Sequence, residues 1–202
     1  MHEQATQVML HPVILAVPDT MLTWTGRRKV LALSRLARAA ARQSARRAGG
    51  LLGRLVKNND NVPLPSNGWH WSVAHKPAFV AGVAGSAPLG IDIEPIQPRS
   101  RGLLDKIADP EEWRLGDEDE WHLFFRFWTA KEAVLKAVGM GLKGLSRCRV
   151  LTIDDPCCMT LTYEGKIWTV HQSMRHGHLA AVASDGLSMR WRWPVHHTTT
   201  GH

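Results

Sequence analysis

The chain has 202 residues, of which 44% are hydrophobic and 21% charged, so it is long enough for one large domain or two small ones with a substantial core. Its formal net charge of +7 favours an anionic partner, such as nucleic acid, a phosphorylated molecule or an acidic protein, and composition does not choose among them. The three cysteines form no C-x-x-C pair, and no apolar run approaches the ~20 residues of a membrane span. We therefore expect a soluble cytoplasmic protein without a disulfide framework or a zinc site.

The first part of the chain is predicted to contain a short strand, a long basic helix and three further strands. Residues 13–17 form an apolar strand candidate, and helical spacing of apolar residues predicts a helix over 27–57, which Gly49-Gly50 weakens. A loop rich in Asn, Pro and Asp follows at 58–68. The next strands are expected at 69–74, 79–84 and 89–94.

The second part is predicted to contain another long helix and several short strands. A helix over 117–138 has acidic residues in its first turn and glycines after its end, and a short helix is expected at 103–108. Residues 196–202 are expected to be a disordered tail. Further strands are expected at 149–153, 159–163, 166–171, 179–184 and 189–193.

A weak internal repeat relates the two parts of the chain. Residues 79–85 resemble residues 179–184, and each segment follows a histidine-containing turn and leads through a turn into another strand. This repeat indicates two similar α+β halves, divided near residues 85–100.

Two acidic residues at alternate positions mark the strand expected at 89–94. In the sequence G-I-D-I-E, Asp92 and Glu94 face the same side of the strand. Two carboxylates on one side repel each other unless a cation or a base lies between them, which favours a metal site. The alternative is a strand end with two solvated acids in front of Pro95.

A third acidic residue lies between two lysines on the long helix. Glu132 and Lys136 are four residues apart, so a surface ion pair would account for them. The helix is apolar around them, however, so we interpret Lys131, Glu132 and Lys136 as a helix edge that meets a polar ligand. Because carboxylates hold Mg²⁺ and ammonium groups neutralise phosphate oxygens, the two motifs together predict an enzyme that acts on a phosphoanhydride.

Together the two motifs closely resemble the signature of the Sfp-type 4′-phosphopantetheinyl transferases. The resemblance is carried by G-I-D-I-E and F-W-T-A-K-E-A-V-L-K-A-V-G-M-G-L, with His75 at a family-like distance before Asp92, and it covers residues 65–145 well. It implies an α+β fold of two similar α/β halves related by a pseudo-twofold, residues 1–88 and 89–195, with the active site between them. It also implies transfer of the phosphopantetheine arm of coenzyme A to a serine of a carrier protein, with release of 3′,5′-ADP.

The resemblance also implies roles for individual residues. Asp92, Glu94 and Glu132 would hold Mg²⁺ on the pyrophosphate of coenzyme A. Lys136 would contact the pyrophosphate, and His75 would contact a phosphate of coenzyme A. A serine hydroxyl needs a base to accept its proton, and Glu132, or a water that it holds, is the natural candidate.

The sequence departs from the family pattern in the region that would hold the nucleotide. Ala74 replaces the usual serine before His75, and the Gly-Lys-Pro segment often found upstream has no clear match. Other basic residues would then contribute contacts to coenzyme A. We expect these contacts from His75, Lys131 and Lys136, with Arg46, Arg47 and Lys76 as possible substitutes.

Two other functions would explain part of the sequence. A nucleic-acid-binding module would explain the net charge and the arginine-rich helix, but it leaves the acid–lysine motifs unexplained. A Mg²⁺-dependent nuclease would need an E-x-K triplet, whereas Glu94 is followed by Pro95 and Ile96. We expect instead a monomer that binds coenzyme A and an acidic acyl or peptidyl carrier protein, without binding nucleic acid or a membrane.

Overall fold

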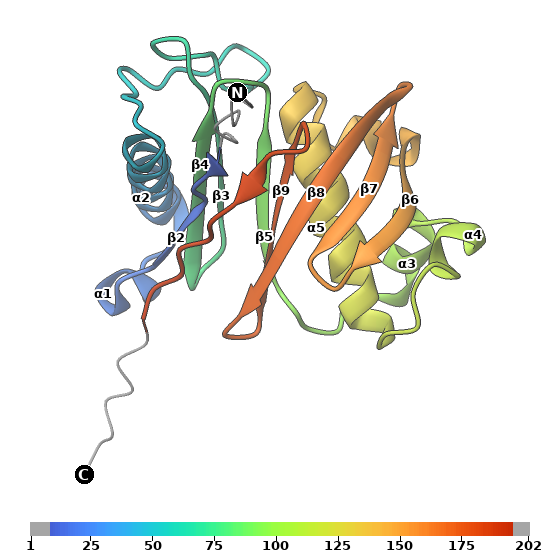
Figure 1. Cartoon of the computed structure of the whole chain (residues 1–202). Helices are drawn as coiled ribbons and strands as arrows, with labels where there is room; N and C mark the ends of the chain where they lie inside the picture. Colours follow the sequence, from blue (N-terminus) through green and yellow to red (C-terminus); the bar gives the residue numbers. More distant parts are fainter. Residues whose placement is uncertain (1–8, 196–202) are drawn as a thin grey trace, which may run out of the picture.

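Two antiparallel sheets, each with one long helix on one face, and a parallel pair of short strands make up the computed structural model, which describes residues 9–195 except for the side chain of Leu142 (Figure 1). The predicted tail at 196–202 lies outside the described residues. The strands are β1 (Met9–Leu10), β2 (Val13–Ala16), β3 (His70–His75), β4 (Phe79–Gly85), β5 (Gly90–Pro95), β6 (Cys148–Asp155), β7 (Cys158–Tyr163), β8 (Lys166–Arg175), β9 (His178–Ser184) and β10 (Ser188–Met189). The helices are α1 (Asp19–Leu22), α2 (Gly26–Arg47), α3 (Leu104–Ile107), α4 (Pro110–Trp113) and α5 (Glu120–Val138), with 3₁₀ turns η1 (Arg101–Leu103) and η2 (Gly141–Arg147).

The same order of elements occurs in both sheets. One sheet has the strand order β2-β4-β3 and the other has the order β5-β9-β8-β7-β6. Along the chain, β2-α2-β3-β4 is matched by β5-α5-β8-β9, with the hairpin β6-β7 inserted after α5. In each case the last strand lies between the other two, so the similar segments 79–85 and 179–184 are interior strands of their sheets.

The chain returns to its first sheet after β9. Strand β10 pairs with β1 in parallel, and the backbone N–H of Ile14 donates a hydrogen bond to the carbonyl oxygen of Arg192 at 2.8 Å. The buried side chain of Trp193 packs in one apolar cluster with Ile14 of β2 and Ile91 of β5. The two sheets therefore share core residues, and residues 188–193 lie with the first sheet.

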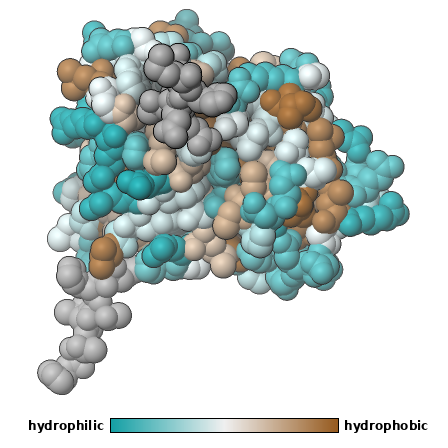
Figure 2. Space-filling view, in the orientation of Figure 1, coloured by the Kyte–Doolittle hydropathy of each residue, from teal (hydrophilic) through white to brown (hydrophobic). Residues whose placement is uncertain are grey.

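The long basic helix is shorter than predicted. Helix α2 ends at Arg47, so the prediction of a helix through residue 57 is wrong beyond that point. Gly49 has a φ of +79°, and Gly50 approaches the ring of Trp69 so closely that a side chain would not fit. The glycine pair therefore ends the helix. Hydrophilic residues cover much of the surface over α2 (Figure 2).

Other differences from the predicted elements have local causes. Helix α5 begins at Glu120 and not at residue 117, because the Asp119 side chain caps it by accepting hydrogen bonds from two backbone N–H groups. The prediction of a strand at 189–193 is wrong except at its start, because this segment pairs with other strands only at Met189 and, through an isolated bridge, at Arg192. The short elements β1, α1, α4 and η2 were not predicted. Within residues 9–195, no helix combines the length and the apolar character that a membrane span requires.

Helix α5 packs directly on the backbone of β5 at Gly90. A Cβ atom at this position would lie 1.9 Å from the carbonyl oxygen of Ala133 and 2.7 Å from the backbone nitrogen of Ala137. We predict that Gly90→Ala lowers the free energy of unfolding by about 3 kcal/mol, because backbone atoms cannot move aside as a side chain can. Urea unfolding would measure this effect. Gly102→Ala is the control, since its Cβ would meet no atom within 4 Å, and equal stability of the two variants would contradict the prediction.

Candidate functional site

Strand β5 brings two acidic side chains to the face that α5 covers. Asp92 is 5% exposed and Glu94 is 6% exposed, whereas Ile91 and Ile93 point into the apolar cluster on the other side of the strand. The prediction that both acids share one face is therefore confirmed. A buried carboxylate is costly unless a charge or hydrogen bond compensates it, so the partners of these two residues matter.

Two lysines supply this compensation. The Lys136 ammonium of α5 lies 2.7 Å from Asp92 Oδ1 and also donates a hydrogen bond to the carbonyl oxygen of Ile91 at 3.0 Å. Lys76 follows β3 in the chain, and its ammonium lies 2.6 Å from Glu94 Oε1. The Trp128 indole N–H of α5 donates to the same Glu94 oxygen at 3.2 Å. Elements of both sheets thus meet at these acids.

Glu132 joins the same group of charges from α5. Its pKa is raised first by burial, and the negative charges of Asp92 and Glu94 raise it further, while Lys136 acts in the opposite direction. The pKa of Glu94 is likewise raised by burial and then by the charge of Asp92. The structure therefore brings together Asp92, Glu94, Glu132, Lys76 and Lys136.

Two buried oxygens of this group, Asp92 Oδ2 and Glu132 Oε1, have no hydrogen-bond partner among residues 9–195. Such oxygens fit a hard cation, because carboxylates are ligands that Mg²⁺ prefers. Among residues 9–195, however, no three His, Cys, Asp or Glu side chains are already arranged as a metal site. The ammonium groups of Lys136 and Lys76 contact Asp92 Oδ1 and Glu94 Oε1, so an ion bound to those oxygens would have to compete with these contacts.

His75 lies at the end of β3 in a positively charged environment. Its pKa is lowered by partial burial, and then by the charges of Lys136, Lys76 and Lys57. The imidazole is exposed, so it can reach a ligand. An anion bound among these cations would offset the charges that lower the pKa of His75.

Lys131 takes no part in this group, and its prediction as a coenzyme A contact is corrected. Its side chain is 2% exposed, and its ammonium lies 2.7 Å from Glu112 Oε1 of α4 and 2.6 Å from the carbonyl oxygen of Ile107. Successive residues of a helix point about 100° apart, so Lys131 and Glu132 leave α5 in different directions. Lys131 therefore has a structural role.

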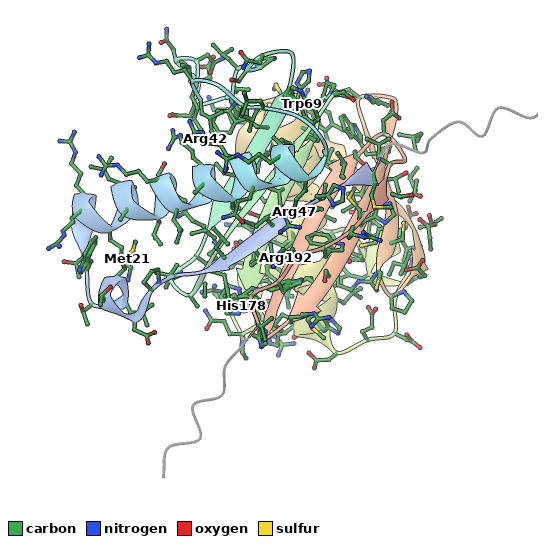
Figure 3. The ribbon with its side chains drawn as sticks, turned by 60° about the vertical axis from the view of Figure 1, so that its left-hand side comes forward. Met21, Arg42, Arg47, Trp69, His178 and Arg192 are labelled. Carbon is green, nitrogen blue, oxygen red and sulfur yellow. The ribbon has the colours of Figure 1, made fainter. Side chains whose placement is uncertain are left out.

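Arg46 and Arg47 are also apart from the acids. Both are exposed at the end of α2, where they line a small hollow with Gln43. Figure 3 shows Arg47 on the same side of the molecule as Arg192, where the C-terminal segment returns. Neither arginine lines the groove beside Lys136, so their role as coenzyme A contacts stays a prediction.

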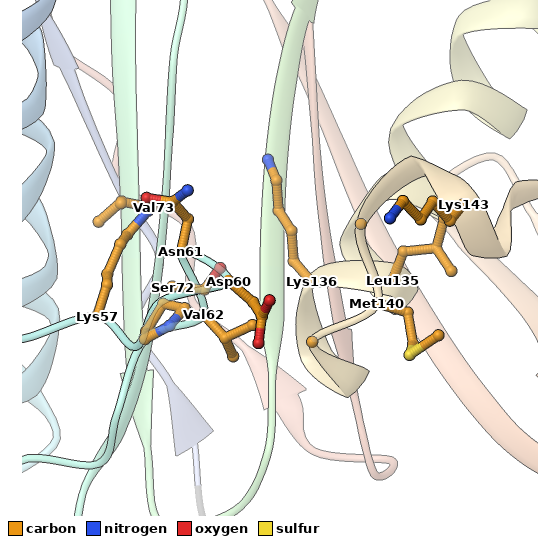
Figure 4. Close-up of a pocket in the computed structure, with 13 residues that line it drawn as sticks. Lys57, Asp60, Asn61, Val62, Ser72, Val73, Leu135, Lys136, Met140 and Lys143 are labelled. Atoms are coloured by element: carbon orange, nitrogen blue, oxygen red, sulfur yellow. The ribbon is translucent and has the colours of Figure 1, made fainter.

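A groove of about 580 Å³, lined in part by Lys136, lies between the first sheet and the C-terminal end of α5 (Figure 4). Its walls include Lys57 and Asp60 of the loop before β3, Val73 of β3 and Lys143 of η2. Sequence reasoning missed Lys57 and Lys143, because neither belongs to a motif. Lys57 stands beside a loop rich in Asn and Pro, and Lys143 follows the glycines after α5. These positions were the features of the sequence from which the two lysines could have been found.

A smaller hollow of about 240 Å³ lies on the other side of the acids. Glu94 and Lys76 line it together with Arg99, Phe124 and Trp128. Arg99, which the sequence analysis also missed, has its guanidinium 4.0 Å from Glu94 Oε2. The acids thus lie between two hollows, and a long substrate could extend on both sides of them.

Comparison with known proteins identifies a family for the part of the chain that holds these acids. The family model described as "4′-phosphopantetheinyl transferase superfamily" matches residues 88–183, which include Asp92, Glu94, Glu132 and Lys136. The chain is 32% identical over 97 residues to 4′-phosphopantetheinyl transferase psf-1 of Bacillus pumilus, an alignment that covers 46% of this chain and 41% of that protein. It is 39% identical over 75 residues to 4′-phosphopantetheinyl transferase HetI of Nostoc sp., covering 34% of this chain and 32% of that protein.

Another relative is matched over more of its length. The chain is 30% identical over 142 residues to 4′-phosphopantetheinyl transferase AcpT of Salmonella typhimurium, covering 58% of this chain and 69% of that protein. Against psf-1 and HetI, by contrast, the chain spans between about a third and two-fifths of the relative's length. These names give the nucleic-acid-binding alternative no support. The chain belongs to the 4′-phosphopantetheinyl transferase superfamily.

Proposed function

We propose that the protein transfers the 4′-phosphopantetheine arm of coenzyme A to a serine of an apo carrier protein and releases 3′,5′-ADP. The observation that carries this proposal is the group of three acids and two lysines where elements of both sheets meet, beside a groove that Lys136 also lines. The names of the relatives support the same activity.

The proposal includes dependence on Mg²⁺, held by Asp92, Glu94 and Glu132. The unpartnered oxygens of Asp92 and Glu132 support this assignment, since a buried carboxylate oxygen without a hydrogen bond is a favourable ligand for a cation. When bound, the ion would neutralise charge on the pyrophosphate oxygens of coenzyme A.

The protein's own side chains would supply the remaining chemistry. Glu132, whose Oε1 has no hydrogen-bond partner in the described part of the chain, would accept the proton of the serine hydroxyl directly or through a water. Lys136 would neutralise the charge that develops on the pyrophosphate as the bond between phosphorus and the leaving oxygen breaks. His75 and Lys76 lie beside these groups and would orient the phosphates.

The proposal extends to the arrangement of the halves and to the partner. The recurring order β-α-β-β supports a pseudo-twofold relation between the two halves, with the reaction between them. The net charge of +7 supports an acidic acyl or peptidyl carrier protein as partner, because opposite charges speed association. A monomer in the cytoplasm, where the free cysteines stay reduced, completes the proposal.

Mass spectrometry of an apo carrier protein would test the activity. After incubation with the enzyme, coenzyme A and Mg²⁺, we expect the carrier to gain the mass of one phosphopantetheine group. A carrier whose acceptor serine is replaced by alanine should gain nothing, and chelation of Mg²⁺ should stop the reaction of the intact carrier. If a panel of acyl and peptidyl carriers stays unmodified with coenzyme A and Mg²⁺ in excess, the proposed function is wrong.

A further inference from the structure

A further hollow, of about 530 Å³, shares no lining residue with the groove beside Lys136 or with the hollow at Glu94. It lies among β2, α2, β8 and the C-terminal segment 191–195. Gln43 of α2 lines it and also lines the small hollow of about 220 Å³ beside Arg46 and Arg47. The two hollows therefore adjoin at this residue, and together they are called the Gln43 hollow below.

The Gln43 hollow is built from the counterparts of the elements that hold the acids. In the matching order of elements, β2 corresponds to β5, α2 to α5 and β8 to β3. Strand β2 contributes Leu15 to the hollow, whereas β5 contributes Asp92 and Glu94 to the candidate site. Neither β2 nor α2 contains an acidic residue. The hollow thus repeats the setting of the candidate site without the carboxylates that would hold a metal ion.

Arginines take the place of these acids. Arg175 and Arg192 line the larger part of the Gln43 hollow, and Arg46 and Arg47 line the smaller part. All four are exposed, and in the described part of the chain the arginines that pair with acids lie elsewhere. Figure 3 shows Arg47 and Arg192 on the same side of the molecule. No acidic side chain of residues 9–195 lines either part, so a bound anion would meet only positive charge there.

The wall that carries Arg192 is held in place by hydrogen bonds. The backbone N–H of Arg192 donates to the carbonyl oxygen of Pro12 at 2.9 Å, and its carbonyl oxygen accepts from the N–H of Ile14 at 2.8 Å. The indole N–H of Trp193 donates to Ser173 Oγ at 2.9 Å and fixes the segment to β8. A wall that is already ordered loses little conformational entropy when a ligand binds.

The rest of the wall suits a planar, partly apolar ligand. Leu15, Trp191 and Pro194 line the larger part of the hollow, and each is partly exposed. Guanidinium groups bind phosphate through paired hydrogen bonds, and an indole ring stacks on a nucleobase. The volume is also that of a small-molecule site. We propose that the Gln43 hollow binds a nucleotide without a metal ion, with the base against Trp191 and the phosphates at the arginines.

Calorimetric titration of the whole chain with ATP, in excess chelator, would test this site. The wild-type protein should bind ATP, and Arg192→Met should bind it about tenfold more weakly or less, as expected for loss of one charge-assisted contact. Gln43→Glu should have a similar effect, because it places a negative charge where the two parts of the hollow meet. Arg114→Met, at an exposed arginine after α4 outside every hollow described above, is the matched control and should bind as the wild type does.

Two further measurements separate this site from the groove beside Lys136 and test the role of the base. Lys143→Met removes an exposed cation of that groove and should leave the affinity for ATP unchanged. The wild-type protein should bind ATP about fivefold or more tightly than inorganic triphosphate, because one stacked base adds to the affinity. Trp191→Leu should remove this preference.

Several results would overturn the proposed site: no binding of ATP in chelator, full affinity in both Arg192→Met and Gln43→Glu with their folds intact, or a loss in Lys143→Met alone. Equal affinity of the wild-type protein for ATP and inorganic triphosphate would exclude the base contact at Trp191. Much tighter binding of a single-stranded RNA, lost in Arg192→Met, would indicate a nucleic-acid surface instead. Because these titrations use no Mg²⁺ and no carrier protein, their outcome is separate from that of the transfer assay.

Discussion

Glu132→Gln is expected to lower the rate of phosphopantetheine transfer at least about 100-fold, while the protein stays folded. Glutamine keeps the size of the side chain but removes the negative charge and the proton-accepting oxygen. Removing one group that stabilises a transition state typically costs about 10²–10³ in rate. Single-turnover measurement of carrier modification, with coenzyme A and Mg²⁺ in excess, would give the rate.

The stability of this variant provides a second readout. Burial and the charges of Asp92 and Glu94 raise the pKa of Glu132, so its ionised form is disfavoured in the folded protein. An acid whose folded pKa is raised reduces stability as the pH rises above the pKa that it has in the unfolded chain. At neutral pH, Glu132→Gln should therefore unfold at the same temperature as the wild-type protein or at a higher one. A strongly reduced unfolding temperature would mean that lost activity reflects misfolding.

The matched control for this prediction lies on the same helix. Glu120 is exposed in the first turn of α5 and pairs with Arg101, remote from the acids of β5. Glu120→Gln should transfer phosphopantetheine at the wild-type rate. Undiminished transfer by Glu132→Gln, with a stable fold, would remove Glu132 from the mechanism.

The acid motif could be predicted from the sequence because its geometry is local. Alternation along a strand places Asp92 and Glu94 on one face whatever the rest of the fold does. The motif on α5 also singled out Lys136, and the structure places its ammonium against Asp92. For these residues, the spacing along a single strand or helix decides on which side of that element the side chain lies.

Contacts between elements could not be predicted in this way. Lys131 and Glu132 are neighbours in the motif, and the spacing does not indicate that α4 packs on the side of α5 where Lys131 points. Lys57 lies on a loop whose shape depends on the side chain of Asn58, for which no periodicity exists. The end of α2 at Arg47 likewise depends on the close approach of Trp69 to Gly50.

Lys131→Met is expected to lower the free energy of unfolding by about 3–5 kcal/mol, because it leaves Glu112 as an uncompensated buried charge. Glu112 is 4% exposed, and its Oε1 also accepts a hydrogen bond from the backbone N–H of Val150 at 2.7 Å. Its Oε2 accepts from the backbone N–H of Asp109 and so caps α4. The lysine thus joins α5 to α4 and β6, and its loss should loosen this contact. Chemical denaturation would measure the effect.

The same variant separates a structural lysine from a ligand contact. At a temperature where Lys131→Met is still folded, we expect its affinity for 3′,5′-ADP to equal that of the wild-type protein, since the ammonium lies against Glu112 and Ile107 and not in the groove. Lys106→Met, on the exposed side of α3, should change neither stability nor affinity. If Lys131→Met instead kept its stability and lost affinity for the nucleotide, Lys131 would bind the donor after all, because a buried ion pair cannot be broken without a cost in folding.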